Sequence, residues 1–199
     1  MKKRSNKKKK ENFFLKEQYL KSWNYLKESK NFIFLAIGIF FAFAFLGFFV
    51  KLPEEFSNMI LDYLKEIILK TENLSSLGLI KFIFLNNLQS SFVGMVFGFV
   101  FGIVPILALI ANGFVVGFVS AMAVKSAGFG TLLYLLPHGI FELPAIFISL
   151  GLGIKFGTFI FRKNQLKKFR NFLWESLRVF IFVVLPLLIV AGIIEGLLI

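Results

Sequence analysis

Long apolar stretches separated by polar segments dominate the chain. Five of them are long enough for a helix to cross the hydrocarbon core of a bilayer, which takes about 20 residues. They cover residues 32–50, 82–104, 107–124, 131–154 and 177–198. The pattern predicts an all-α, polytopic membrane helix bundle with about five transmembrane helices, forming a single domain over residues 32–199.

Three further segments combine apolar residues at helical spacing with charged ones. Residues 1–31 form a basic tail followed by a helix with Leu15, Tyr19, Trp23 and Leu26 at helical spacing, and residues 158–176 form a second basic helix. Both are predicted to lie at the inner membrane surface. Residues 53–73 are predicted to form an amphipathic outer helix, which either lies on the outer leaflet or caps the bundle.

The distribution of Lys and Arg predicts the orientation of these helices. Eleven of the 23 basic residues lie in 1–30 and seven lie in 155–178, whereas segment 51–81 has four with five acidic residues. Short loops rich in Lys and Arg stay in the cytoplasm. Five spans place both basic segments on that side, so we expect a cell-membrane protein with a cytoplasmic N-terminus and an outside C-terminus.

Composition supports this interpretation and excludes others. The chain is 57% hydrophobic with a mean hydropathy of +0.79, which is far from a typical soluble domain. The net charge of +12 comes without a nucleic-acid-binding motif, so we expect the bilayer, and no nucleic acid, as the partner of these charges. There is no cysteine, which excludes disulfides.

Glycines recur at four-residue spacing in the second and third spans: Gly94, Gly98, Gly102, Gly113 and Gly117. Such spacing lets two helix backbones approach closely and gain van der Waals contact inside a membrane. The glycines therefore indicate helix packing. They pack within the bundle or between two copies in a homodimer, and the spacing alone leaves both open.

Polar groups inside the apolar stretches are the other candidates for function. His138 and Glu142 lie four residues apart between Pro137 and Pro144, so they share one helix face in a stretch that the prolines kink or interrupt. An ionisable residue in the bilayer normally faces the bundle or a water-filled cavity. The pair is either a structural hydrogen-bond node or part of a substrate, proton or ion site; one His and one Glu make an incomplete metal site.

Further polar residues can complete this set. The amides of Asn86, Asn87 and Asn112 can donate and accept hydrogen bonds and are candidate partners of the pair. Glu195 either reaches the headgroups or faces the bundle. No nucleophile with a base, zinc signature or phosphate-binding loop is present, so we expect no enzyme activity, no catalytic residue, no metal and no cofactor.

Several of these features resemble the stage II sporulation protein M (SpoIIM) family. They are the Asn86-Asn87 pair, the glycine-rich span after it, Asn112-Gly113 with Gly117, the stretch at 137–145 and the late Glu195. The resemblance covers about residues 32–199 and implies a five-span membrane protein. The family's founding member is a membrane scaffold for a peptidoglycan-degrading machine with two partner proteins.

Two functions therefore remain open. The first is a non-enzymatic membrane scaffold that organises membrane protein partners, with homodimerisation as a further expectation. The alternative is a small transporter or channel whose polar path is lined by His138, Glu142 and the three asparagines.

Overall fold

The computed structural model describes residues 2–198, with the side chains of 14–133, 140 and 142–194. Over this range the chain is helical and contains no strand. The helices are α1 Lys2–Phe49, α2 Glu54–Thr71, α3 Ser76–Val96, α4 Ile103–Ala127, α5 Leu132–Gly157, α6 Gln165–Val179 and α7 Leu185–Leu198. Among the described residues, five helical segments are long and apolar enough to cross a membrane, which confirms the predicted all-α bundle.

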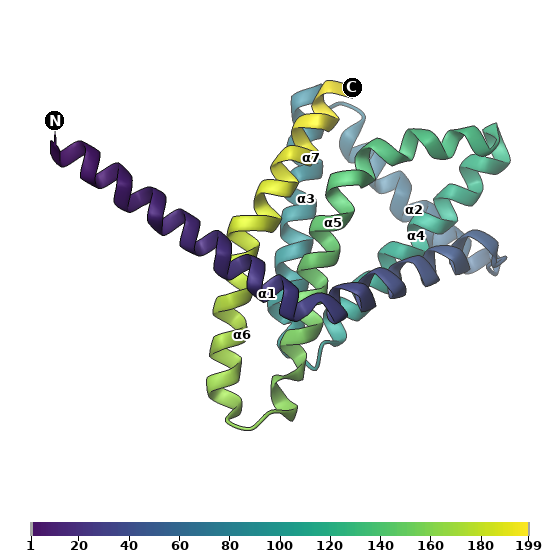
Figure 1. Ribbon diagram of the computed structural model, residues 1–199. Coiled ribbons are helices and arrows are strands. Elements are labelled where there is room, and N and C mark those ends of the chain that lie inside the picture. The colour runs from purple at the N-terminus through teal and green to yellow at the C-terminus, as the bar shows by residue number, and fades with distance from the viewer. Residues whose placement is uncertain (1, 199) are drawn as a thin grey trace.

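Helix α1 joins the predicted tail, interfacial helix and first span without a break (Figure 1). Its two halves differ in direction, because the N-terminal half projects from the bundle and the C-terminal half runs along α4 (Figure 1). One face of the N-terminal half is buried at Ser22, Tyr25, Leu26 and Ser29. Of the predicted apolar stripe, Leu15, Tyr19 and Trp23 are exposed, and Leu26 is buried.

The connection between α3 and α4 is a tight turn. A short 3-10 turn, Phe97–Phe99, follows α3, and Gly102 then adopts φ +71° immediately before α4. Glycine reaches this left-handed conformation without the steric cost that a side chain imposes. Pro105 sits in the first turn of α4, where its missing N–H has no intrahelical partner to lose.

Helix α5 is the central helix of the fold. Figure 1 shows it bending in its N-terminal half, where the sequence predicts a kink, yet it stays helical through both prolines. Two clusters of buried side chains meet on it. One joins it to α1, α3, α6 and α7 around Met95, Leu152 and Val184, and the other joins it to α1 and α4 around Phe40 and Leu109.

The last span is longer than predicted. Helix α6 continues through a π-helical turn, Phe180–Val184, into α7, so the predicted basic helix and fifth span form one continuous rod. The π turn directly precedes Pro186, whose ring would clash with the carbonyl group four residues earlier in a regular α-helix. The wider turn relieves this clash.

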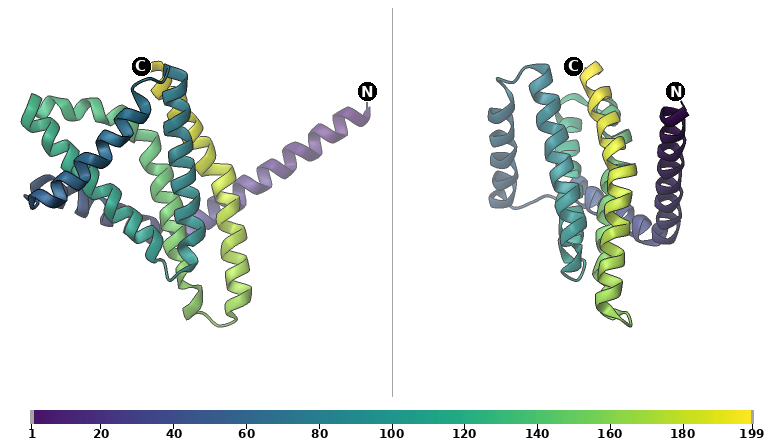
Figure 2. Two further views of the ribbon diagram at one scale, coloured as in Figure 1. Left: turned by 180° about the vertical axis from the view of Figure 1, so that it is seen from behind. Right: turned by 90° about the vertical axis from the view of Figure 1, so that its left-hand side faces the viewer.

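Helix α2 stands apart from the bundle (Figure 2, right). None of its residues is buried, and Phe56, Met59 and Tyr63 are more than half exposed. The structure therefore does not support the alternative in which this helix caps the bundle. On its polar side, Lys70 donates a hydrogen bond to Glu66 and holds the pKa of that carboxyl below its usual range.

Candidate functional site

Gly94, at the C-terminal end of α3, and Gly98, in the turn that follows it, face α5. A Cβ atom at Gly98 would come within 3.0 Å of the backbone of Gly153, and one at Gly94 would overlap the side chain of Leu150. Gly157 of α5 meets the backbone of Phe101 and Gly102 equally closely. The contacts of Gly98 and Gly157 are between main chains, so a side chain at either position would force the helices apart.

A second seam joins α4 to α1. Gly113 lies against the carbonyl group of Phe40, and Gly117 lies against that of Ala44. A Cβ atom added at either glycine would come closer to that carbonyl group than real Cβ atoms do. Gly47 of α1 returns the contact against Phe114. We call this contact and that between α3 and α5 the glycine seams. The sequence reasoning missed the partner glycines Gly47, Gly153 and Gly157, although they are also spaced among apolar residues.

Glu142 and Asn87 lie together around a very small cavity. The cavity lies between α3, α5 and α7 and has a volume of about 10 Å³. Asn87 and Glu142 are both half-buried, and apolar residues of α3 and α7 form the remaining wall. A cavity needs about 10–15 Å³ to hold one water molecule. The arrangement can therefore hold at most one water between an amide and a carboxyl group.

The other predicted amides do not join this cavity. Asn86 is exposed on the outer side of α3, and Asn112 is exposed on α4 and donates a 2.8 Å hydrogen bond to the carbonyl oxygen of Ala108 in its own helix. The side chains of His138 and Glu195 lie outside the described residues. The backbone of each residue is helical. His138 lies one turn before Glu142 in α5, and Glu195 lies near the end of α7.

A polar node that the sequence reasoning missed lies at the other end of α5. Lys155 is 8% exposed, and its Nζ lies 3.7 Å from the centre of the Tyr25 ring and donates a 2.9 Å hydrogen bond to Ser29 Oγ. A desolvated cation above an aromatic face is held by the ring quadrupole. The node fixes α1 to α5 where α1 changes direction. In the sequence, the four-residue spacing of Tyr25 and Ser29, which places them on one helix face, was the feature that could have indicated this node.

Near this node, a polar cleft of about 370 Å³ lies between α1 and α6. It is lined by side chains of both signs, including Lys21, Glu28, Lys168 and Glu175. Several of these charges are already paired, Lys21 with Glu17 and Arg178 with Glu175. No group of three or more His, Cys, Asp or Glu side chains in the described part of the chain could hold a metal ion.

The fold and its buried polar contacts define a multi-pass α-helical membrane protein. Comparison with models of protein families identifies the family of this chain. The family model described as Stage II sporulation protein M matches residues 32–198, so the chain belongs to this family and the resemblance found in the sequence is confirmed. No curated protein and no solved structure matches the chain.

Proposed function

We propose that the protein is a non-enzymatic scaffold that organises other proteins in the membrane. The observation that carries the proposal is helix α2, an amphipathic helix of 18 residues with none of them buried. Its apolar side exposes Phe56, Met59 and Tyr63 next to the bundle. An exposed apolar stripe on a tethered helix suits helix-in-groove binding to a partner.

Copurification from native membranes tests the proposal. The protein, extracted in mild detergent, should carry stoichiometric partner proteins. Replacing Phe56, Met59 and Tyr63 by Ser should release them, whereas replacing Asn58 and Lys65 on the polar side by Ala should not. A wild-type protein that purifies alone, or partners that survive the apolar substitutions, would argue against α2 as the recruiting surface.

The proposed orientation places the N-terminus and the α5–α6 connection in the cytoplasm and the C-terminus outside. It is supported by the basic residues of 1–30 and 155–178. The chain has no cysteine, so single cysteines near each terminus can be labelled with a membrane-impermeant maleimide in intact cells. We expect labelling only at the C-terminal position; labelling at both ends would overturn the orientation.

Transport is the second candidate, and Asn87 with Glu142 at a water-sized cavity favours it. A proton or a small ion that moves by way of a single water molecule needs no wider cavity in the resting state of the protein. A proteoliposome flux assay separates the two functions. Flux that is lost in Glu142→Gln while the helical fold persists would favour transport, and no flux in the wild-type protein would favour the scaffold.

A further inference from the structure

The outer side of α3 carries polar residues near the middle of its apolar segment. The helical segment containing α3 that is long and apolar enough to cross a membrane comprises 24 residues from Ser76 to Phe99, whereas the sequence predicted a span over 82–104. Asn86 and Gln89 lie on either side of the midpoint of this segment. Both side chains are exposed, as is that of Ser90. In a bilayer this surface meets hydrocarbon, where a polar side chain without a hydrogen-bond partner is costly.

The amides of Asn86 and Gln89 have no hydrogen-bond partner in the part of the chain whose side chains the structure describes. Ser90 Oγ donates a 3.3 Å hydrogen bond to the carbonyl oxygen of Asn87 in its own helix. The side chains of Asn86 and Gln89 make no hydrogen bond to any residue that the structure describes. The unmet hydrogen-bonding capacity therefore points outward, to a group supplied by another molecule.

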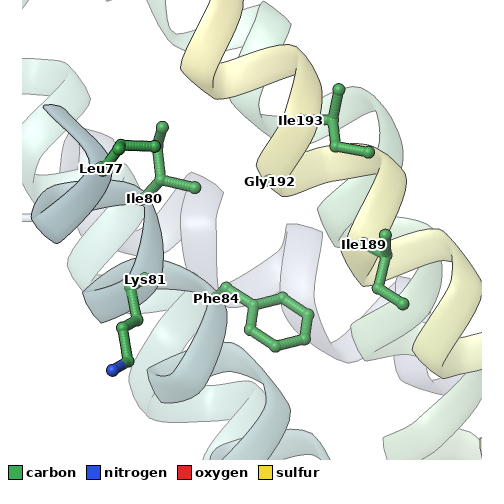
Figure 3. Close-up of a pocket in the computed structure, with 7 residues that line it drawn as sticks. All are labelled: Leu77, Ile80, Lys81, Phe84, Ile189, Gly192 and Ile193. Atoms are coloured by element: carbon green, nitrogen blue, oxygen red, sulfur yellow. The ribbon is translucent and has the colours of Figure 1, made fainter.

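An apolar groove runs beside these amides, between α3 and the α6–α7 rod. Its first part, about 510 Å³, lies between Leu77 and Phe84 on α3 and Ile189 and Gly192 on α7 (Figure 3). In this view the Phe84 ring points toward α7, and Lys81 extends away from it. Figure 2 (right) shows α3 and α7 side by side, with α2 on one side and the N-terminal half of α1 on the other.

The second part of the groove lies further along the same two helices and shares no lining residue with the first. It has a volume of about 540 Å³ and is lined on α3 by Leu88, Gln89 and Phe92, facing Leu177 and Ile181. From Leu77 to Phe92 the groove follows α3 for about 22 Å at 1.5 Å per residue. One leaflet contributes about 15 Å of hydrocarbon. The two parts together extend past one leaflet, so a helix that crosses both leaflets can contact both parts.

We propose that the groove binds α3 of a second copy of this chain, related by a twofold axis along the membrane normal. Every copy threads the membrane in the same direction, so Asn86 and Gln89 of two copies automatically lie at the same depth. An amide is both donor and acceptor, so identical amides can pair across the axis. The α3 helix of each copy then lies in the groove of the other, and Gln89 of each meets its counterpart.

This surface differs from the one suggested by glycine spacing. Gly94 and Gly98 face α5 within the same chain, and Gly113 and Gly117 face α1. Their main-chain contacts are already made, so they are not free for a second copy. The dimer therefore depends on amides and on the groove, and it is independent of partner recruitment by α2.

Cross-linking of the purified protein in lipid bilayers tests the proposal. Because the chain has no cysteine, Gln89→Cys and Val93→Cys each provide one thiol on the outer side of α3, and Phe41→Cys provides the matched control. Phe41 is 53% exposed at the middle of the first predicted span. Mild oxidation by copper phenanthroline at low protein-to-lipid ratio should give covalent dimers at 89 and 93 and few at 41.

The amide itself is tested by substitution without cysteine. Gln89→Leu together with Asn86→Leu should weaken dimerisation, measured by energy transfer between labelled copies in vesicles, by about tenfold, the range expected for interhelical hydrogen bonds. Gln89→Asn should retain part of the association, and Phe41→Ala should leave it unchanged. Circular dichroism of each variant verifies that the helices persist.

Three outcomes would overturn the proposal. They are a wild-type protein that stays monomeric in bilayers, equal cross-linking at 41 and 89, and undiminished dimerisation after both amides are replaced. A cross-link from position 89 to a different protein in native membranes, with no homodimer in purified bilayers, would assign the groove to that protein instead. Each result leaves the copurification test of α2 unaffected.

Discussion

The two sides of α3 have different surroundings, because one side packs against α5 and the other is exposed. One side lies against α5 through glycines, with Gly98 against the backbone of Gly153 and a 2.7 Å hydrogen bond from Ser149 Oγ to the carbonyl oxygen of Ser91. The other side exposes the amides of Asn86 and Gln89 beside an apolar groove. Close contact at small residues and a hydrogen bond between helices join the inner side to α5, although the Ser91 hydroxyl has no hydrogen-bond partner among the described residues. The outer side presents exposed amides that make no hydrogen bond to any described residue.

The comparison extends to the rest of the molecule. Lys155 is buried against Tyr25 and Ser29, so even a charged group finds its partners when it faces the bundle. No residue of α2 is buried, and the exposed amides of Asn86 and Gln89 on α3 make no hydrogen bond to any described residue. Lipid offers no hydrophobic drive between helices, so close backbone contact and hydrogen bonding decide which surfaces associate. The following substitutions test whether the inner and outer surfaces differ in this way.

The largest effect is expected in a glycine seam. Gly117→Ala places a methyl group against the carbonyl oxygen of Ala44 and should lower the free energy of unfolding by about 3 kcal/mol. Steric trapping in bicelles measures this quantity. Gly38→Ala is the matched control, because no atom lies within 4 Å of its added methyl group. Equal effects at the two glycines would mean that the seam is looser than described.

The next effect concerns the lysine node. Tyr25→Leu removes the aromatic face beneath the buried Lys155 ammonium and should lower the free energy of unfolding by about 2 kcal/mol. Tyr25→Phe keeps the ring and should have little effect on the same measurement. If both variants lose the same stability, the tyrosine hydroxyl rather than the ring holds the node.

A smaller loss is expected where α5 meets α3. Ser149→Ala removes the hydrogen bond to the carbonyl oxygen of Ser91 and should lower the free energy of unfolding by about 0.6 kcal/mol, a usual value for such bonds in membranes. Ser126→Ala is the control, since that hydroxyl bonds only within its own helix turn. A control that loses as much as Ser149→Ala would assign the effect to the serine-to-alanine change itself.

The smallest effect is expected on the outer side of α3. Gln89→Leu in the monomer, diluted in bicelles, should change the free energy of unfolding by less than about 0.5 kcal/mol, because the amide has no partner among the described residues. A loss above about 1 kcal/mol would show that Gln89 is satisfied inside the chain. The contrast between the two sides of α3 would then disappear.

The sequence by itself determined the all-α class and about five membrane helices, because a backbone in long apolar runs, without water as a hydrogen-bond partner, must become helical. Its motifs also determined the family. It also marked the glycines and polar residues of interest. The tertiary structure decided which helices the glycines join. It also decided that Asn87 and Glu142 line the same small cavity while Asn86 faces outward. Adjacent residues on a helix point about 100° apart, so the packing of neighbours alone assigns one to the core and the other to lipid.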